Sequence, residues 1–303
     1  MKSEKGKPIK KKYVIYTVIV AGYDTIKQPL VVDDRFDYVF FTDEVKETKI
    51  GVWQVRPISY RDENKMRLSR YAKCLPTTVL PDYEASLYID GTLQIAESWV
   101  YERFIELVEQ ENVDWAGVNH FHRDCIYDEM CGIVGEFPKG VHDYETIGWY
   151  CKLKKEGFPP HFGLYENNLI LRRHCQVVES VGEQWWETLN KSCKRDQFSL
   201  MYLLWKYPLK KDFFLDKSID TKHTDKFIYS IHSVPRKNIV MNFHEKVRRR
   251  CWISKYGSLW YGYVMEEASK FPFPRYCLYE WELYAIFRYW LPAMVRIILK
   301  KWH

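Results

Sequence analysis

Short apolar runs alternate with longer amphipathic segments over residues 13–207 of the chain. Runs of β-branched and aromatic residues predict strands, and apolar residues spaced three or four apart predict helices. We expect strands over Tyr13–Ala21, Tyr38–Thr42, Val52–Arg56, Ala85–Asp90, Asp114–Asn119 and Leu169–Arg172. We expect helices over Asn64–Cys74, Glu97–Glu111, Asp143–Glu156, Gln176–Lys191 and Asp196–Lys206, and an irregular loop over His120–Gly140. Strands separated by helices predict an α/β sheet whose ligand site lies at the carboxyl ends of the strands.

The two ends of the chain differ from this pattern. Six lysines among the first twelve residues predict a disordered basic arm over 1–12, followed by one domain over 13–237. Residues 238–303 are predicted to form a helical extension rich in aromatic and basic residues, with Glu280–His303 helical and broken at Pro292. A basic helix rich in Trp and Leu suits a membrane interface, and it equally suits packing against the domain.

Composition excludes some classes of function. The net charge of +6 comes without zinc-finger spacing or an RNA-binding aromatic signature, so we expect no nucleic-acid partner. Eight cysteines without a CxxC pair indicate reduced thiols. No run approaches the roughly 20 apolar residues of a spanning helix. We therefore expect a cytoplasmic protein, either free or peripheral on the inner face of the membrane through its C-terminal segment.

Charged residues near the ends of the predicted strands are candidates for binding a diphosphate or a cation. Asp90 leaves a buried strand into Gly91-Thr92, where it would either bind a hard cation or cap the turn. Asp43 ends another strand and would read a nucleoside or cap its own turn. The basic residues of the first predicted helix share one broad face, which suits either a diphosphate or solvent; they are Arg67, Arg70 and Lys73.

The predicted loop after Asn119 holds the densest polar group in the chain. Its members are His120, His122, Arg123, Asp124, Asp128 and Glu129. Histidines two apart in an extended segment share a face and would suit a metal. The same composition occurs in ordinary loops, and Arg123 with the two acids would instead bind sugar hydroxyls.

Two later carboxylates are candidates for a catalytic base or nucleophile. Glu166 precedes a predicted strand, and Asp196 with Gln197 opens a predicted helix. Asp196 is equally suited to capping that helix. His232 is a candidate late metal ligand, with His223 and His244 competing and a buried structural histidine as the alternative.

Taken in order, these segments resemble the plant mucilage-related and turgor-regulation glycosyltransferase-like family, which has relatives in bacterial polysaccharide loci. The resemblance spans about residues 13–207 and rests on ordered motifs: Tyr16–Asp24, Phe40–Asp43, Arg67 to Lys73, Tyr88–Ile95, His122–Asp124 with Tyr127–Glu129, Gly157–Pro159, Gly163–Glu166 and Arg195–Gln197.

The resemblance implies a GT-A-like (Rossmann-like) mixed sheet flanked by helices, nucleotide-sugar use and dependence on Mn²⁺ or Mg²⁺. Thr92 stands where the usual paired D-x-D has its second carboxylate, so basic residues would share the neutralisation of the diphosphate. The residue roles that we expect fall into four groups. The donor would be bound by Gly22, Tyr23, Asp24, Asp43, Arg67, Arg70, Lys73, Asp90 and Gln197, and the metal by Asp90 and His232. The catalytic residues would be Asp196 and Glu166, and the substrate would be bound by His122, Arg123, Asp124, Asp128 and Glu129.

The function expected is transfer of a hexose-type sugar from a nucleotide diphosphate donor to a cell-surface or capsular glycan, free or lipid-linked. Two alternatives remain open. A metal-dependent hydrolase of lipid amides would need His120, His122 and an acid on one zinc. A non-catalytic sugar-nucleotide-binding module would keep the fold without turnover.

Overall fold

The computed structural model of the protein describes residues 12–134, 143–191 and 195–232. Residues 12–122 and 165–232 form one compact unit, and residues 123–134 and 143–164 belong to a second. The predicted arm, apart from Lys12, and the predicted extension over 238–303 lie outside the described residues. So does the helix expected over Glu280–His303.

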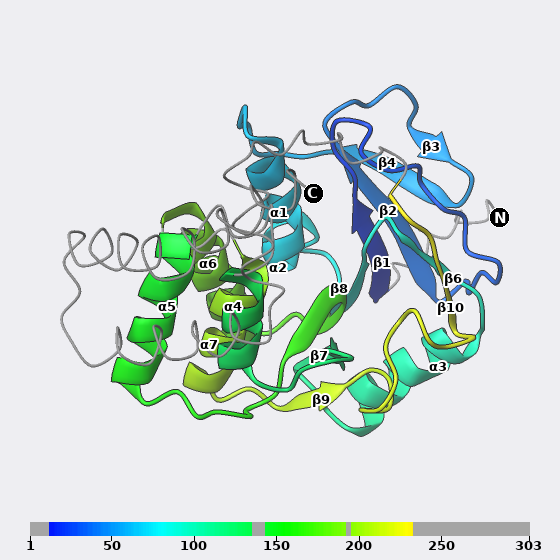
Figure 1. The fold of residues 1–303 in the computed structure, drawn as a ribbon. Coiled ribbons are helices and arrows are strands. Elements are labelled where there is room, and N and C mark those ends of the chain that lie inside the picture. The colour runs from blue at the N-terminus through cyan, green and yellow to red at the C-terminus, as the bar shows by residue number, and fades with distance from the viewer. Residues whose placement is uncertain (1–11, 135–142, 192–194, 233–303) are drawn as a thin grey trace, which may run out of the picture. The chain divides into compact units, whose positions relative to one another are not determined.

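A mixed sheet is the central element of the first unit (Figure 1). Its strands are β1 (Tyr13–Val18), β2 (Phe36–Thr42), β3 (Lys49–Ile50), β4 (Trp53–Pro57), β5 (Ala85–Ile89), β7 (Trp115–Asn119), β8 (Tyr165–Arg173) and β9 (Lys211–Phe213). Their order is β3-β4-β2-β1-β5-β8-β7-β9. β1 lies parallel to β2 and β5, and β8 runs antiparallel between β5 and β7. A second, two-stranded antiparallel sheet pairs β6 (Leu93–Ile95) with β10 (Phe227–Tyr229).

Helices flank the sheet and confirm the predicted α/β class. In the first unit they are α1 (Lys65–Cys74), α2 (Pro76–Val79), α3 (Trp99–Ile105) with a π-helical continuation η1 (Glu106–Gln110), α6 (Gln176–Lys191) and α7 (Asp196–Lys206). α1 contacts β1, α7 contacts β8, and α6 packs on both helices. The second unit holds α4 (Ile126–Val134) and α5 (Asp143–Glu156).

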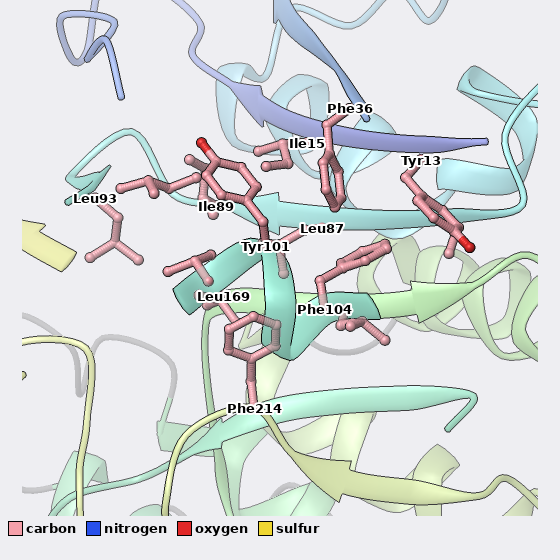
Figure 2. Close-up of a cluster of buried hydrophobic side chains, with 14 of the residues drawn as sticks. Tyr13, Ile15, Phe36, Leu87, Ile89, Leu93, Tyr101, Phe104, Leu169 and Phe214 are labelled. Atoms are coloured by element: carbon pink, nitrogen blue, oxygen red, sulfur yellow. The ribbon is translucent and has the colours of Figure 1, made fainter. Parts of the chain in front are cut away.

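The face of the sheet under α3 carries the main hydrophobic core (Figure 2). Tyr13 and Phe36 lie on this face, and the ring of Phe104 packs edge-on against both, at 5.2 and 5.0 Å between centroids. Strand residues that alternate with these point to the opposite face. Tyr16, for example, places its hydroxyl 3.4 Å from the carbonyl oxygen of Ala72 in α1. The α1 face of the sheet is therefore the one that carries polar groups into the interior.

Most predicted elements are confirmed with shifted ends, and one prediction is wrong. The predicted loop His120–Gly140 contains the helix α4. Its buried residues Ile126, Tyr127 and Met130 have helical spacing. The secondary structure of this segment is therefore determined by how these side chains pack and not by its polar composition. The strand predicted over Leu169–Arg172 begins at Tyr165, because pairing with β7 continues past a β-bulge between Gly117 and Val118.

Gly182 sets the distance between α6 and α1. A Cβ built there would lie 2.6 Å from the carbonyl oxygen of Cys74, the last residue of α1. We therefore expect Gly182→Ala to lower the free energy of unfolding by about 1–3 kcal/mol, because the helices must separate. Urea denaturation measures this. Gly148→Ala in α5 is the matched control, since its Cβ meets nothing within 4 Å, and the helix-favouring residue should raise stability. Equal or higher stability of Gly182→Ala would contradict the close packing.

Candidate functional site

Asp90 directly follows β5 and opens a tight turn. Its backbone N–H donates to the carbonyl of Asn168 at 2.8 Å, and its carbonyl accepts from the N–H of Leu93 at 2.9 Å. Its Oδ1 accepts hydrogen bonds from the Tyr88 hydroxyl at 3.1 Å and from the Gly91 N–H at 3.2 Å. Asp90 thus stabilises its own turn, as the alternative interpretation held. Both side-chain bonds end on Oδ1, so binding of a cation would use Oδ2.

Tyr88 links this turn to charged residues of two helices. The buried ring of Tyr88 lies under the Lys73 ammonium of α1, with 5.0 Å between Nζ and the ring centroid. The same Nζ donates to Asp196 Oδ2 of α7 at 3.0 Å. The Lys73 and Asp196 side chains are only 12% and 19% exposed. Residues far apart in the sequence therefore meet beside Asp90: a cation, a second carboxylate and a phenol.

The charges at this point determine the protonation states. Burial alone would raise the pKa of Asp196, but the Lys73 ammonium and the Arg70 guanidinium lower it far below its ordinary value. Burial, followed by the Asp90 carboxylate, raises the pKa of Tyr88 well above its usual value. At neutral pH Asp196 is consequently an anion, and Tyr88 keeps the proton that it donates to Asp90.

The basic residues of α1 do not act as one group. Arg70 lies close enough to Asp196 to lower its pKa, as Lys73 does. Arg67 instead approaches Asp62, with 3.7 Å between Nη1 and Oδ2, and its side chain is half exposed. The Asn64 side chain caps this helix by accepting from the N–H groups of Met66 and Arg67. Of the three predicted diphosphate ligands, two lie at the Asp196 site.

Glu166 and Gln197 have partners on β8 and on the loop after β9. Glu166 Oε2 accepts from Asn168 Nδ2 at 3.1 Å, and its Oε1 lies 3.6 Å from Lys222 Nζ. Asn168 is also the residue whose carbonyl holds the Asp90 backbone, so Glu166 belongs to the surroundings of the Asp90 turn. Gln197 donates from Nε2 to the carbonyl of Tyr165 at 3.2 Å. Asp196 does not cap α7, which begins after Arg195.

The loop after β1 is fixed by Asp43. Oδ1 of Asp43 accepts from the Ala21 N–H at 2.8 Å, and Oδ2 pairs with Lys65 Nζ at 2.9 Å. Burial would raise the pKa of Asp43, but the Ala21 amide and the Lys65 ammonium lower it. Ala21 and Gly22 have φ angles of +53° and +58°, in the left-handed region. Asp43 therefore holds the strained turn that presents the exposed ring of Tyr23.

Asp24 and His232 form a pair beside the Asp90 turn. Asp24 Oδ2 lies 2.9 Å from His232 Nδ1, and the Tyr23 ring lies 4.7 Å from the imidazole. A Cβ built on Gly91 would lie 3.2 Å from the Cβ of Asp24, so the turn packs directly on Asp24. A carboxylate on one ring nitrogen is the usual support of a metal-binding histidine, and it equally suits a structural one. His223 pairs with Asp220 at 2.6 Å, and His244 lies outside the described residues.

The residues around Asp90 fit a cation that is shared with a phosphate. Within residues 12–134, 143–191 and 195–232, no group of three or more His, Cys, Asp or Glu side chains is arranged to hold a metal ion. Thr92 is buried where a second carboxylate would stand. Mg²⁺ is commonly bound by one or two carboxylates together with substrate phosphates. Asp90 fits that mode, and a cage made only of the described protein groups does not.

The remaining substrate candidates fall on both units. In the first unit, His120 Nδ1 accepts from the His122 N–H at 3.3 Å, so a hydrogen bond already joins the two histidines that the alternative zinc site would require. In the second unit, Arg123 pairs with Glu129, and Asp124 Oδ1 lies 2.8 Å from His161 Nδ1. Asp128 is an exposed residue of α4. Arg123 and Glu129, two of the predicted substrate-binding residues, are thus each other's ion-pair partner.

The sequence assigns no role to three residues of the site. Tyr88 opens the motif Tyr88–Ile95 without a role of its own, and Asn168 and Lys222 belong to no motif. A tyrosine two positions before Asp90 on the same face of a strand was the available signal, since both side chains leave the same side of the sheet.

The chain matches a known protein family and a curated relative. Residues 3–231 match the model of the family described as TOD1/MUCI70, glycosyltransferase-like domain. The chain is 21% identical over 249 residues to the probable hexosyltransferase MUCI70 of Arabidopsis thaliana, a match that covers 72% of this chain and 42% of that protein. The chain therefore spans less than half the length of this curated relative.

Similar solved structures include the apo bifunctional glycosyltransferase WbbM, at 12% identity and a TM-score of 0.40, covering 69% of this chain and 39% of that one. They also include the galactosyltransferase LgtC in complex with donor and acceptor sugar analogs, at 9% identity and a TM-score of 0.39, covering 66% and 72%. These likenesses are partial and carry no information about individual site residues.

Proposed function

Because the chain belongs to the TOD1/MUCI70 glycosyltransferase-like domain family, we propose that it transfers a hexose-type sugar from a nucleotide diphosphate donor to a glycan acceptor. The family that the sequence motifs resemble is thereby confirmed, and glycosyl transfer by this chain is proposed on that basis. The donor, the acceptor and the roles of individual residues are the proposal.

The observation that carries the proposal is the meeting of Asp90, Lys73 and Asp196 around Tyr88. A nucleoside diphosphate is an anionic leaving group, and its departure is favoured by positive charge at the phosphates. Lys73 and Arg70 supply such charge from α1, and Asp90 Oδ2 would hold Mn²⁺ or Mg²⁺. When bound, the cation would neutralise charge on the diphosphate oxygens. The surrounding residues hold Asp90: Tyr88 and Gly91 fix its Oδ1, and Asn168 fixes its backbone.

The second carboxylate has a separate role. Transfer breaks the bond between the anomeric carbon and a diphosphate oxygen and forms a bond from that carbon to an acceptor oxygen, whose proton passes to a base. Asp196 is ionised, and Lys73 orients its carboxylate, so it would stabilise positive charge that develops on the sugar. Glu166 would take the acceptor proton, with Asn168 and Lys222 holding its two oxygens. Gln197 follows Asp196 and would contact the donor sugar.

The acceptor we propose is a capsular or other surface glycan, free or lipid-linked, met at the inner face of a membrane. In the part of the chain that the structure describes, no helix has the length and apolarity needed to cross a bilayer. We propose that membrane contact falls to residues 238–303, which lie outside the described residues. Co-sedimentation of the full chain with anionic vesicles tests this, and recovery in the supernatant would contradict it.

Incubation of the purified chain with UDP-, GDP- and ADP-hexoses tests the function. We expect release of the nucleoside diphosphate from one donor class, stimulated by Mn²⁺ or Mg²⁺ and abolished by EDTA, and faster when a glycan acceptor is present. Donor binding without release, seen as a thermal shift alone, would favour the non-catalytic module. Stoichiometric zinc together with amide hydrolysis would favour the hydrolase. Neither binding nor release of any donor would refute the proposed function.

A further inference from the structure

Arg172 is a fully buried arginine in β8 that the proposed chemistry does not use, with 0% of its surface exposed. Its Nη1 donates to the backbone carbonyl of Lys73 at 2.7 Å, and its Nη2 donates to the hydroxyl of Tyr16. The guanidinium carbon lies 5.2 Å from the ring centroid of Trp115. Nε has no hydrogen-bond partner among the described residues. The two terminal nitrogens of Arg172 thus reach a carbonyl and a phenol.

A cation in this position is costly for the fold. Burial lowers the pKa of Arg172, but a guanidinium stays protonated at neutral pH. Removing a charge from water is unfavourable, and replacing a buried charge by apolar residues of similar volume often leaves a protein no less stable. Packing alone would therefore favour a leucine or a methionine at position 172. An arginine at this buried position therefore needs an explanation other than core packing.

The structure gives that reason at the end of α1. The last carbonyls of a helix lack partners within the helix and carry partial negative charge. The Tyr16 hydroxyl lies 3.4 Å from the carbonyl of Ala72 and 3.3 Å from that of Lys73. Arg172 donates to the same Lys73 carbonyl. Together Tyr16 and Arg172 form a cap, built from the sheet, for the last turn of α1.

We propose that Arg172 is a positioning residue: by holding the Lys73 carbonyl, it fixes the last turn of α1 so that the Lys73 ammonium stays on Asp196. Lys73 joins both ends of this chain of contacts, since its backbone meets Arg172 and its Nζ meets Asp196 at 3.0 Å. A shift of the helix end would carry the ammonium off both Asp196 and the Tyr88 ring. This role rests on the proposed glycosyl transfer.

Kinetics of two neighbouring arginine variants test the proposal. Arg172→Met is expected to lower kcat for donor turnover about 10- to 100-fold, because a small misplacement of a catalytic group has effects of this size. The KM for the donor should change less. Arg173→Met is the matched control, since Arg173 is the next residue of β8 and bonds instead to Asp114 and Asn112. It should stay within about twofold of wild type. Arg172→Lys keeps the charge but places its donors on a single nitrogen, so it should recover part of the loss and serves where Arg172→Met fails to fold.

A double-mutant cycle separates positioning from a general structural effect. If Arg172 acts through Lys73 and Asp196, Arg172→Met should cause little further loss in an Asp196→Asn background. Fold-changes that multiply would overturn the proposal, as would equal losses in Arg172→Met and Arg173→Met.

Hydrogen exchange tests the anchoring without any turnover. The N–H of Leu75, which donates to the carbonyl of Tyr71 at the end of α1, should exchange faster in Arg172→Met and not in Arg173→Met. Unchanged exchange in Arg172→Met would overturn the inference even if the enzyme is active. A wild-type chain that releases no nucleotide would refute the function, and the exchange experiment would still decide the anchoring.

Discussion

Asp90→Asn is expected to lower kcat/KM for the donor by about 100- to 1000-fold, which corresponds to the several kcal/mol that a metal-held leaving group gains in the transition state. The asparagine oxygen can still accept hydrogen bonds from Tyr88 and Gly91, so the turn should persist. What is lost is the negative charge that holds the cation. The Mn²⁺ concentration needed for half-maximal activity should rise accordingly. Steady-state kinetics over a Mn²⁺ titration measure both effects.

Asp216→Asn is the matched control for this change. Asp216 also holds a turn through one carboxylate oxygen, which accepts from the N–H of Ser218 at 2.8 Å and from its hydroxyl at 2.6 Å. Loss of charge there should leave the Mn²⁺ titration and the activity unchanged. Full activity of Asp90→Asn would refute the role of Asp90 in holding the diphosphate.

Asp196→Asn should have a similar effect on activity and an added effect on stability. The kcat should fall about 100- to 1000-fold, because the preorganised charge next to the sugar is lost. The variant also leaves the Lys73 ammonium without its carboxylate in a mostly buried place. Breaking a buried pair costs about 3–5 kcal/mol, and the residual exposure of this pair favours the lower end. Urea denaturation and donor kinetics measure the two effects separately.

The pH dependence of this stability has a defined sign. The pKa of Asp196 is lower in the folded chain than the value of about 3.9 expected when unfolded. The stabilisation is therefore fully present above that unfolded value and is lost as pH falls toward the folded pKa. The difference in unfolding free energy between wild type and Asp196→Asn should be constant from about pH 7 to pH 5 and shrink below about pH 4.

Glu187→Gln provides the comparison for Asp196→Asn. Glu187 pairs with Lys191 on the solvent side of α6, where both side chains are largely exposed, and such pairs contribute little. Its activity should match wild type. A difference for Asp196→Asn that grew as pH fell, or unchanged kcat, would contradict the assignment.

The fold could be predicted where burial leaves a local pattern. β1, β2 and β5 are almost wholly buried, so their apolar runs are sufficient to predict them as strands. The three-residue strands β6 and β10 could not be found, because each exists only through pairing with a segment more than 130 residues away. α4 was missed because its polar residues matched a loop, while its buried residues show a helical pattern only once packed.

The site could be predicted as a set of residues but not as an arrangement. Asp90, Lys73 and Asp196 were all candidates, yet nothing local joins Lys73 to Asp196 across 123 residues or Asp24 to His232 across 208. Arg172 ends the strand that the sequence predicts over Leu169–Arg172. A charged residue directly after Leu169, Ile170 and Leu171 was the available signal that this strand has a polar partner on the α1 face of the sheet.

A crystal structure of the chain with Mn²⁺ and UDP, and in parallel GDP, tests the central claim most directly. It should show the cation within about 2.2 Å of Asp90 Oδ2 and of diphosphate oxygens, with Lys73 or Arg70 directed at the phosphates. A diphosphate bound away from the Asp90 turn, or a cation held by other side chains, would contradict it.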